Sequence, residues 1–213
     1  MVESIVINQE LIQTKDQIII DLLKEGKEFL KLKSANPDLI MDSISIIYKY
    51  LKKKEKIPNN IYKLFTAAYY IISRHPLSFP AHESKKKFCC QFGIELSSLE
   101  YSVNKLREKL NIRKILDDKN YPYFIETDTD IAYKLMKNII KNEVDNKMMN
   151  FLLNSQPVNS QILCEELITH IIFEMKLFPE ELFRQFYELV FELVEDLLSK
   201  YYAYIDLQNS CFI

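Results

Sequence analysis

Glycine and tryptophan are the residues that this sequence most nearly lacks: its 213 residues include two glycines and no tryptophan. Because glycine is the usual residue of tight turns that need a positive φ, its scarcity argues against β-hairpins and favours helices. Apolar runs of about 20 residues, the length needed to cross a membrane, are also missing. We therefore expect an all-α protein that does not enter a membrane.

Cysteine patterns that would indicate a metal site or a disulfide framework are missing too. The four cysteines, Cys89, Cys90, Cys164 and Cys211, form no C-x-x-C pair, so the usual spacing of a structural zinc site is absent. Disulfide frameworks are typical of shorter secreted chains. The N-terminus has neither the basic flank nor the apolar run of a signal peptide. We expect buried free thiols, no cofactor, no metal and a cytoplasmic location.

Sequence motifs of catalysis are weak. The chain has no glycine-rich phosphate loop and no nucleophile elbow. His170 has Glu166 and Glu174 four residues to either side, on one helical face. This arrangement could hold a metal ion, but it is more often a salt-bridged histidine on a helix surface. We expect a protein that is not an enzyme.

Charge is distributed unevenly, although the net charge is only -2. Residues 51–120 carry 15 basic and 7 acidic side chains, whereas residues 121–213 carry 7 basic and 15 acidic ones. This asymmetry indicates a middle region that faces a polyanion and an acidic C-terminal part. In the alternative interpretation, the two oppositely charged regions attract each other within the chain.

Apolar residues recur at helical spacing over most of the chain. In the first half the pattern predicts helices at about 8–33, 38–54, 61–74, 81–92 and 97–110. The third of these is apolar nearly all round, so it should lie at the centre of its domain.

An irregular segment follows residue 112 and contains Pro122, which cannot sit in a helix interior. We place a domain boundary there. Beyond it the pattern predicts helices at about 130–153, broken near Asp145, at 160–176 and at 179–202.

The segment 81–110 is typical of a helix-turn-helix. Gly93 stands between two periodic apolar stretches, where a sharp turn needs a left-handed residue. Ser97 and Glu100 have the spacing of a capping box, in which each side chain satisfies a free backbone amide at the start of a helix. Apolar residues then recur at steps of four, three and four, which gives the second helix one inward face.

Two stretches together resemble the cyclin-like repeat of transcription factor B, the general initiation factor of archaea and eukaryotes. They are "AAYYIISR", from Ala67 to Arg74, and "FGIELSSLEYSVNKL", from Phe92 to Leu106. That family has a central helix of the type A-A-x-Y-I-A-S and a helix-turn-helix of the type G-[VI]-x-x-x-[ST]-[IL]-x-x-x-[YV]-x-x-L. The second match runs from Gly93 to Leu106 without a gap, and the resemblance covers residues 38–112 with a clear pattern.

The sequence also departs from that family. It has no zinc ribbon and no recognisable second repeat, and the loop "HPLSFPAHE" is longer than usual. The resemblance therefore implies one divergent repeat. It would form a five-helix cyclin-like domain at 1–113 with a helix-turn-helix at 81–110, followed by a smaller acidic helical domain at 114–213.

If the helix-turn-helix binds DNA, the start of its second helix faces the major groove. There Asn104 could read adenine, while Lys105 could read guanine or hold a phosphate. The remaining lysines would neutralise backbone phosphates. The expected nucleic-acid-binding residues are Lys85, Lys86, Lys87, Ser98, Tyr101, Asn104, Lys105 and Lys109. The alternative is that these residues form a solvated basic face.

The sequence is compatible with two different functions. In the first, the chain is a transcription-associated protein that binds duplex DNA, a transcription protein or both. In the second, it is a non-enzymatic helical interaction module that binds no nucleic acid and pairs with a protein partner. A homodimer through the C-terminal helices is compatible with either.

Overall fold

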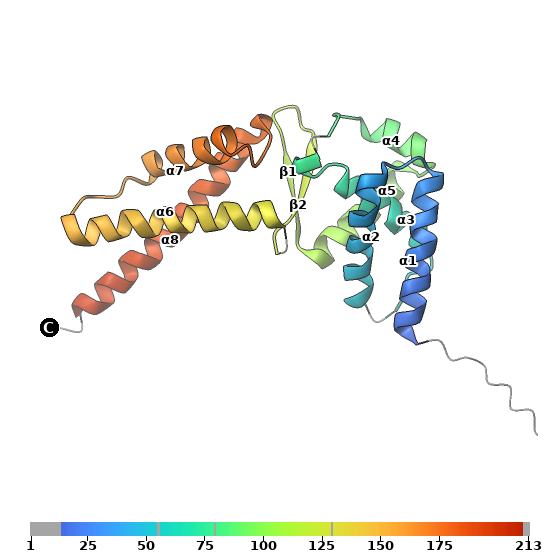
Figure 1. Ribbon diagram of the computed structural model, residues 1–213, viewed down its shortest axis with the longest axis horizontal. Helices are drawn as coiled ribbons and strands as arrows, with labels where there is room; N and C mark the ends of the chain where they lie inside the picture. Colours follow the sequence, from blue (N-terminus) through green and yellow to red (C-terminus); the bar gives the residue numbers. More distant parts are fainter. Residues whose placement is uncertain (1–13, 55, 79, 129, 211–213) are drawn as a thin grey trace, which may run out of the picture. The chain divides into compact units, whose positions relative to one another are not determined.

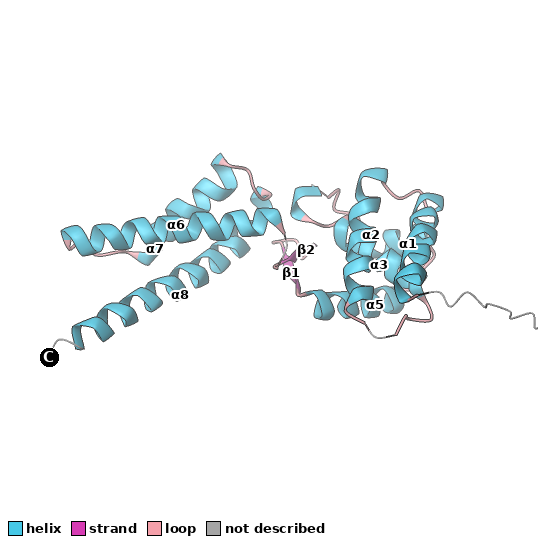
Figure 2. Cartoon of the chain, turned by 60° about the horizontal axis from the view of Figure 1, so that its bottom comes forward, coloured by secondary structure: helices cyan, strands magenta, loops and turns pink. Residues whose placement is uncertain are grey.

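The computed structural model describes residues 14–54, 56–78, 80–128 and 130–210. Most of these residues are helical (Figure 1, Figure 2), which confirms the expectation of a mainly helical protein. The chain divides into two compact units. Unit 1 comprises residues 1–72 and 85–109, and unit 2 comprises residues 73–84 and 110–213. In the described ranges, no helix combines the length and the apolar character needed to cross a membrane.

In the described part of unit 1, helices lie close to the positions that the sequence predicts. They are α1 (Lys15–Leu32), α2 (Pro37–Lys52), α3 (Ile61–Ile72), α4 (Lys85–Phe92) and α5 (Leu96–Leu110). Residues 8–13, where the first helix was expected to begin, lie outside the described residues. The hydroxyl of Thr14 accepts the N–H of Gln17 at the start of α1, and the Asn36 side chain caps α2 in the same way.

α3 is the centre of unit 1, as its all-round apolar character predicted. Its residues Leu64, Phe65 and Ala68 are at most 3% exposed. Gly26 of α1 packs directly against it, because a Cβ atom at this glycine would lie 2.1 Å from the Phe65 ring. One of the two glycines is therefore needed for the close approach of two helices.

Gly93, the other glycine, ends α4 in the left-handed conformation with φ +62°. Two backbone hydrogen bonds complete the turn: Gly93 N–H donates to the Cys90 carbonyl at 3.4 Å, and Ile94 N–H donates to the Cys89 carbonyl at 3.1 Å. This pair of bonds is a Schellman motif, which satisfies the last carbonyls of a helix and requires a left-handed residue. The predicted role of Gly93 in the turn is confirmed.

The predicted capping box at the start of the next helix is wrong. α5 begins at Leu96, so Ser97 is a helical residue and the preceding Glu95 occupies the cap position, where its carbonyl accepts the N–H of Leu99 at 2.9 Å. The carboxylate of Glu100 instead forms an ion pair with Lys85 at 2.8 Å. Because α5 starts earlier than the capping box requires, Ser97 is not in the cap position from which its side chain would accept the N–H of Glu100.

Residues 73–84 do not begin a helix at Ala81, as the sequence pattern predicted. They form one 3-10 turn, Pro76–Ser78, and otherwise run irregularly until α4 begins. Arg74 holds the segment in this path, because its Nη2 donates to the carbonyl of Glu83 at 2.8 Å. Its guanidinium carbon also lies 5.3 Å from the centroid of the Tyr121 ring.

Two histidines attach the same segment to the rest of unit 2. His75 Nε2 lies 2.6 Å from Asp130 Oδ2, and His82 Nε2 lies 2.9 Å from the Tyr123 hydroxyl. The His82 ring also stacks on Tyr121, with 4.4 Å between centroids. Burial raises the pKa of Tyr123 to about 12, so its hydroxyl stays protonated.

Unit 2 contains a β-hairpin, so the expectation of no hairpins, drawn from the scarcity of glycine, was wrong at this one place. β1 (Ile112–Leu116) pairs antiparallel with β2 (Pro122–Glu126), and Ile112 lies opposite Glu126. This is the segment that the sequence pattern marked as irregular. Three consecutive residues of β2, Tyr123 to Ile125, are at most 2% exposed, so the hairpin belongs to the core of unit 2.

The hairpin turn needs no glycine, which is why a glycine-poor sequence can make it. Asn120 adopts the left-handed conformation with φ +59°. The carboxylate of Asp117 accepts the backbone N–H groups of Lys119 and Tyr121 at 2.9 and 2.7 Å. Asparagine tolerates a positive φ, and an aspartate can close a turn with its own side chain.

Three helices form the rest of the described part of unit 2: α6 (Ile131–Asn154), α7 (Ser160–Thr169) and α8 (Phe183–Ser210). α7 continues as a π-helical turn, His170–Glu174, and a 3-10 turn, Glu180–Leu182, precedes α8. The predicted break of α6 near Asp145 is wrong. Asp145 is stabilised inside the helix by hydrogen bonds from Lys141 and from Tyr201 of α8.

The expectation that the thiols are buried is correct for Cys89 and Cys164, and wrong for Cys90, which is exposed on α4. Burial raises the pKa of the Cys164 thiol to about 11. Cys211 lies outside the described residues.

Candidate nucleic-acid interface

A cavity of about 960 Å³ opens on unit 1 where three parts of the chain meet. These parts are the end of α2 with the loop that follows it, the start of α3, and one face of α5 from Ser97 to Lys109. Six lysines line it: Lys53, Lys54, Lys56, Lys63, Lys105 and Lys109. The other lining residues are Tyr50, Ile57, Pro58, Asn59, Asn60, Leu64, Ser97, Ser98, Tyr101 and Ser102. We call this site the lysine groove.

No carboxylate is among the described lining residues of the lysine groove. Glu55, in the same loop, lies outside the described residues. Six ammonium groups around one cavity without a described counter-charge create a positive potential, and a concave wall of low dielectric focuses that potential. The arrangement therefore favours an anionic ligand.

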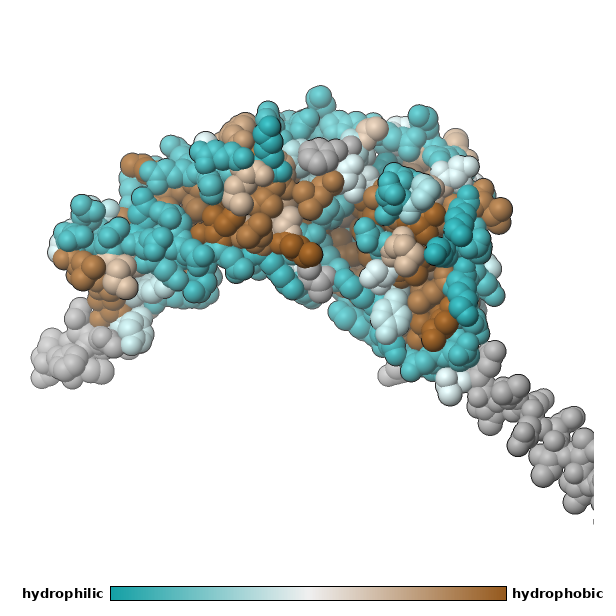
Figure 3. Space-filling model, in the orientation of Figure 1, coloured by the Kyte–Doolittle hydropathy of each residue, from teal (hydrophilic) through white to brown (hydrophobic). Residues whose placement is uncertain are grey.

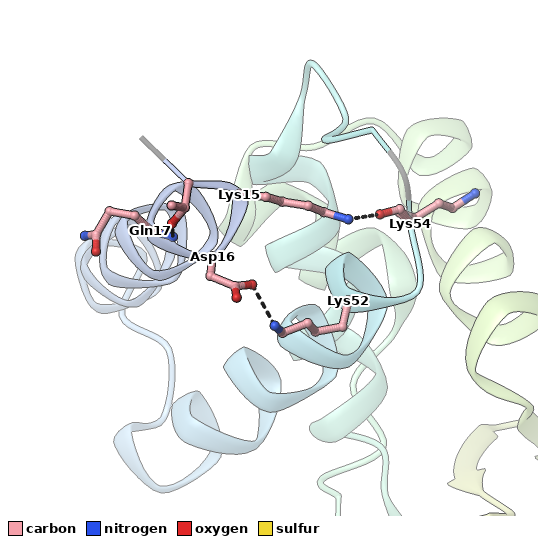
Figure 4. Close-up of polar contacts among 6 residues, drawn as sticks. Lys15, Asp16, Gln17, Lys52 and Lys54 are labelled. Atoms are coloured by element: carbon pink, nitrogen blue, oxygen red, sulfur yellow. Dashed lines mark hydrogen bonds and ion pairs between the residues drawn. The ribbon is translucent and has the colours of Figure 1, made fainter. Parts of the chain in front are cut away.

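The start of α1 holds the loop on one side of the lysine groove (Figure 4). Lys15 Nζ donates to the backbone carbonyl of Lys54 at 2.7 Å, and Asp16 forms an ion pair with Lys52 at 2.7 Å. The Lys52 ammonium lowers the pKa of Asp16, which therefore stays ionised. These contacts fix the backbone from which Lys53 and Lys54 extend.

Two helices begin at the lysine groove, and neither has an acidic residue in its first turn. The N-terminus of a helix carries a partial positive charge and free N–H groups. At the start of α5, Lys63 Nζ donates to the hydroxyl of Ser98 at 3.0 Å. A cation is thus held close to the positive end of a helix, where the helix dipole disfavours it.

Two tyrosines line the groove in different ways. Tyr101 is 68% exposed, and Lys105 Nζ lies 5.7 Å from the centroid of its ring. Tyr50 is 0% exposed, and the hydrogen of its hydroxyl has no acceptor. Burial raises the pKa of Tyr50, while the charge and hydrogen bonding of the nearby Lys105 ammonium oppose this rise. An ammonium can only donate, so Lys105 does not satisfy the hydroxyl as a donor.

The structure brings four of the expected nucleic-acid-binding residues together in the lysine groove: Ser98, Tyr101, Lys105 and Lys109. Asn104 is exposed outside the lining and accepts a hydrogen bond from Arg107 at 3.2 Å. Three others are on α4: Lys85 pairs with Glu100, whereas Lys86 and Lys87 have exposed side chains. These three are not part of the groove lining.

Sequence reasoning missed half of the groove. It interpreted the run "KKKEKIPNN", residues 52–60, only as the end of one helix and the start of the next. Its lysines Lys53, Lys54 and Lys56 line the cavity, as does Lys63 one turn into α3. The feature that could have predicted this part of the groove is the positive charge of residues 49–56, "KYLKKKEK", which contain five lysines and precede the start of a helix.

Clusters that could hold a metal ion are absent from the described residues, taking groups of three or more His, Cys, Asp or Glu side chains. His170 Nδ1 lies 2.5 Å from Glu174, but Glu166 pairs with Lys147 at 3.1 Å. The two glutamates that the sequence places on the face of His170 therefore have different partners.

Comparison of the chain with protein-family models, with curated proteins and with solved structures finds no match.

Proposed function

We propose that this chain is a transcription-associated protein that binds duplex DNA through unit 1, which we interpret as a divergent cyclin-like repeat of the transcription factor B type. The lysine groove is the observation that carries the proposal. It lies at the first turns of α5, the helix that would enter the major groove in a helix-turn-helix. The neighbouring lysines would neutralise the phosphates on either side.

The chemistry of the groove suits a DNA backbone. Lysines contribute affinity that does not depend on base sequence, because each neutralised phosphate releases counterions. Base contacts would come from Tyr101 and Asn104 of α5, which are exposed, and from the half-buried Lys105. The groove would fix the register of the protein on the duplex, and these side chains would contribute the preference for a sequence.

Fluorescence anisotropy with a labelled duplex at two salt concentrations tests this proposal. The triple variant Lys54→Glu/Lys63→Glu/Lys105→Glu should bind about 100-fold more weakly at low salt. The slope of log K against log salt concentration should become less steep by about one for each lysine removed. The matched control is Lys134→Glu/Lys137→Glu/Lys176→Glu, which makes the same change of net charge at exposed positions of unit 2.

The control variant should retain the affinity of the unchanged protein. Equal losses in both triple variants would mean that net charge, not the groove, governs binding. If the unchanged protein fails to bind duplex DNA at low salt, the proposal is wrong.

A second candidate function, protein interaction without nucleic acid, is favoured by the surface of unit 2. Several large apolar side chains near the end of α6 are exposed: Met149 at 57%, Leu152 at 58% and Leu153 at 73%. Figure 3 shows hydrophobic surface in the region of α6 and α7. Exposed apolar side chains that lie together commonly mark an interaction site.

Size-exclusion chromatography with light scattering tests whether these helices form a homodimer. A dimer that becomes a monomer in Leu152→Glu/Leu153→Glu would support this candidate. A monomer at all concentrations would exclude the homodimer and leave only a different protein partner.

A further inference from the structure

We infer that the lysine groove contains a subsite for a single phosphate group at the start of α5, formed by Tyr50, Lys63, Ser98 and Lys105. This inference rests on the proposed function, since it commits to a backbone phosphate of nucleic acid as the occupant. Free phosphate and pyrophosphate present the same phosphate oxygens, and binding assays with a DNA duplex and with each of these two anions distinguish the sources.

The first argument compares the helix starts of unit 1. α1 and α2 each have a capping side chain and an acidic residue in the first turn, Asp16 and Asp38. α3 and α5, which begin at the groove, have no acidic residue there. Glu95 occupies the cap position of α5 but is not among the groove-lining residues, and α4 also has no acidic residue in its first turn. Within the groove, therefore, no acidic side chain from these two first turns competes with an anionic ligand.

The second argument is the position of Lys63. Its ammonium donates to Ser98 Oγ at 3.0 Å, in the first turn of α5. The Ser98 hydroxyl, as acceptor of this bond, can turn its own hydrogen toward another group. An anion beside Lys63 and Ser98 would accept from both and would remove the repulsion between the ammonium and the end of the helix.

The third argument is the Tyr50 hydroxyl, a buried donor without a partner. Leaving such a group unsatisfied is costly, and in native proteins it usually has a reason. Because the hydroxyl oxygen is buried, a neighbouring side chain must move before an anion reaches it. Lys105 is that neighbour, and its long flexible side chain would follow the anion.

The four side chains share one property, since each can donate a hydrogen bond and two of them carry a positive charge. None of the four is a carboxylate or a carboxamide, whose oxygens would compete with a ligand as hydrogen-bond acceptors. A phosphate group offers several acceptor oxygens and a negative charge, which suits a set made only of donors and cations. A neutral ligand would leave the charge of Lys63 and Lys105 uncompensated.

The test uses Tyr50→Phe in the full chain, with Tyr70→Phe as the matched control. Tyr70 is 2% exposed in α3 and does not line the groove. In anisotropy with a labelled duplex, Tyr50→Phe should bind about 10-fold more weakly, the usual loss for a hydrogen bond to a charged group. The slope of log K against log salt concentration should stay unchanged, because binding to a neutral donor releases no counterion from the DNA.

Lys63→Gln separates charge from hydrogen bonding in the same assay, since it should lower the slope by about one. Thermal unfolding without ligand provides a second readout. Tyr50→Phe should be at least as stable as the unchanged protein, because it removes an unsatisfied buried group. A clear loss of stability would mean that the hydroxyl has a structural partner and would overturn the inference.

The outcomes distinguish the subsite from the proposed function. If the duplex binds and Tyr50→Phe equals the unchanged protein, the subsite is wrong and DNA binding stands. If the duplex does not bind, calorimetry with inorganic phosphate and pyrophosphate decides. Binding that Tyr50→Phe loses would support the subsite with a free phosphate as its ligand, and no binding would overturn both.

Discussion

Units 1 and 2 differ in charge and in what that charge contacts. Unit 1 has 17 basic and 12 acidic residues, whereas unit 2 has 11 basic and 18 acidic ones. In unit 1 the excess lysines line a cavity without a described carboxylate. In unit 2 important carboxylates have partners within the unit: Asp130 contacts His75, and Asp145 accepts from Lys141 and Tyr201. The comparison indicates that unit 1 has charge available for a ligand, and that unit 2 uses charge for its own fold.

The two units also differ in packing. Unit 1 gathers its helices around α3, and this requires a glycine where α1 approaches it. Unit 2 packs α6, α7 and α8 together through an apolar cluster that includes Met136, Leu167 and Val190. The following substitutions test whether stability in one unit depends on the other.

The largest effect is expected from Phe186→Ala in α8. Phe186 is 0% exposed and stacks on Phe178 with 4.2 Å between ring centroids. Loss of the ring should reduce the free energy of unfolding by about 3–5 kcal/mol. Hydrogen exchange should accelerate in unit 2 and much less in unit 1. The exposed control Leu153→Ala should change stability by about 0.5 kcal/mol or less. Equal acceleration in both units would show that they unfold together.

The corresponding change in unit 1 is Gly26→Val. The new side chain would overlap the Phe65 ring, which is itself 0% exposed and cannot move away easily. Overpacking of this kind should cost about 1–3 kcal/mol. Hydrogen exchange should now accelerate in unit 1. Adding Phe65→Leu should restore part of the loss, and an unchanged stability of Gly26→Val would contradict the close approach of α1 and α3.

Asp130→Asn tests whether a carboxylate stabilises unit 2. Burial alone would raise the pKa of Asp130, but the hydrogen bonds from His75 and from the backbone N–H of Tyr133 lower it below 3.8. A lowered pKa means that this stabilisation is complete above about pH 4 and is lost as the pH falls through the folded-state value. The variant should lose about 1–2 kcal/mol at pH 7, since it removes the charge that the hydrogen bonds from His75 and Tyr133 N–H and the N-terminus of α6 stabilise.

Urea unfolding between pH 3 and pH 7 measures this effect. The difference between Asp130→Asn and the unchanged protein should shrink as the pH falls below about 4, because the unfolded chain then binds a proton that the folded carboxylate resists. The control Asp42→Asn, at an exposed position of unit 1, should not show this convergence. A difference independent of pH would mean that the carboxylate charge is not involved.

The smallest effect is expected from Gly93→Ala. A Cβ atom there would meet only Lys33 Nζ at 3.6 Å, so the cost comes from the positive φ alone. It should be about 1 kcal/mol, and Gly93→Asn should lose less because asparagine tolerates this conformation. Denaturant unfolding measures both. Equal losses would mean that side-chain volume, not backbone conformation, limits this position.

Helices were predictable from the sequence because their signal is local. The spacing of apolar residues predicted α2 and α3 within two residues, and Gly93 predicted the turn before α5. It predicted the start of α8 within four residues, although α8 continues to Ser210, beyond the expected end at residue 202. The hairpin was missed because Asn120 and Asp117 make a turn for which glycine was expected. The start of α4 was missed because Arg74 holds residues 73–84 through contacts that no local pattern reveals.

The candidate site was predictable only in part, for the same reason. Ser98, Tyr101, Lys105 and Lys109 lie on one face of α5, which helical spacing shows directly. Lys53, Lys54 and Lys56 come from a loop far away in the sequence, and only the packing of α2 and α3 against α5 brings them to the same cavity. The buried, unpartnered hydroxyl of Tyr50 depends on packing as well.

The contacts of residues 73–84 affect how this chain can fold during synthesis and how it can be divided by recombination. On the ribosome, Arg74 and His75 emerge long before their partners Tyr121 and Asp130, so this segment cannot take its native path until the chain has been made to at least residue 130. Neither unit is one continuous stretch of sequence. A single recombination event, or a single proteolytic cut, therefore cannot separate one intact unit from the other.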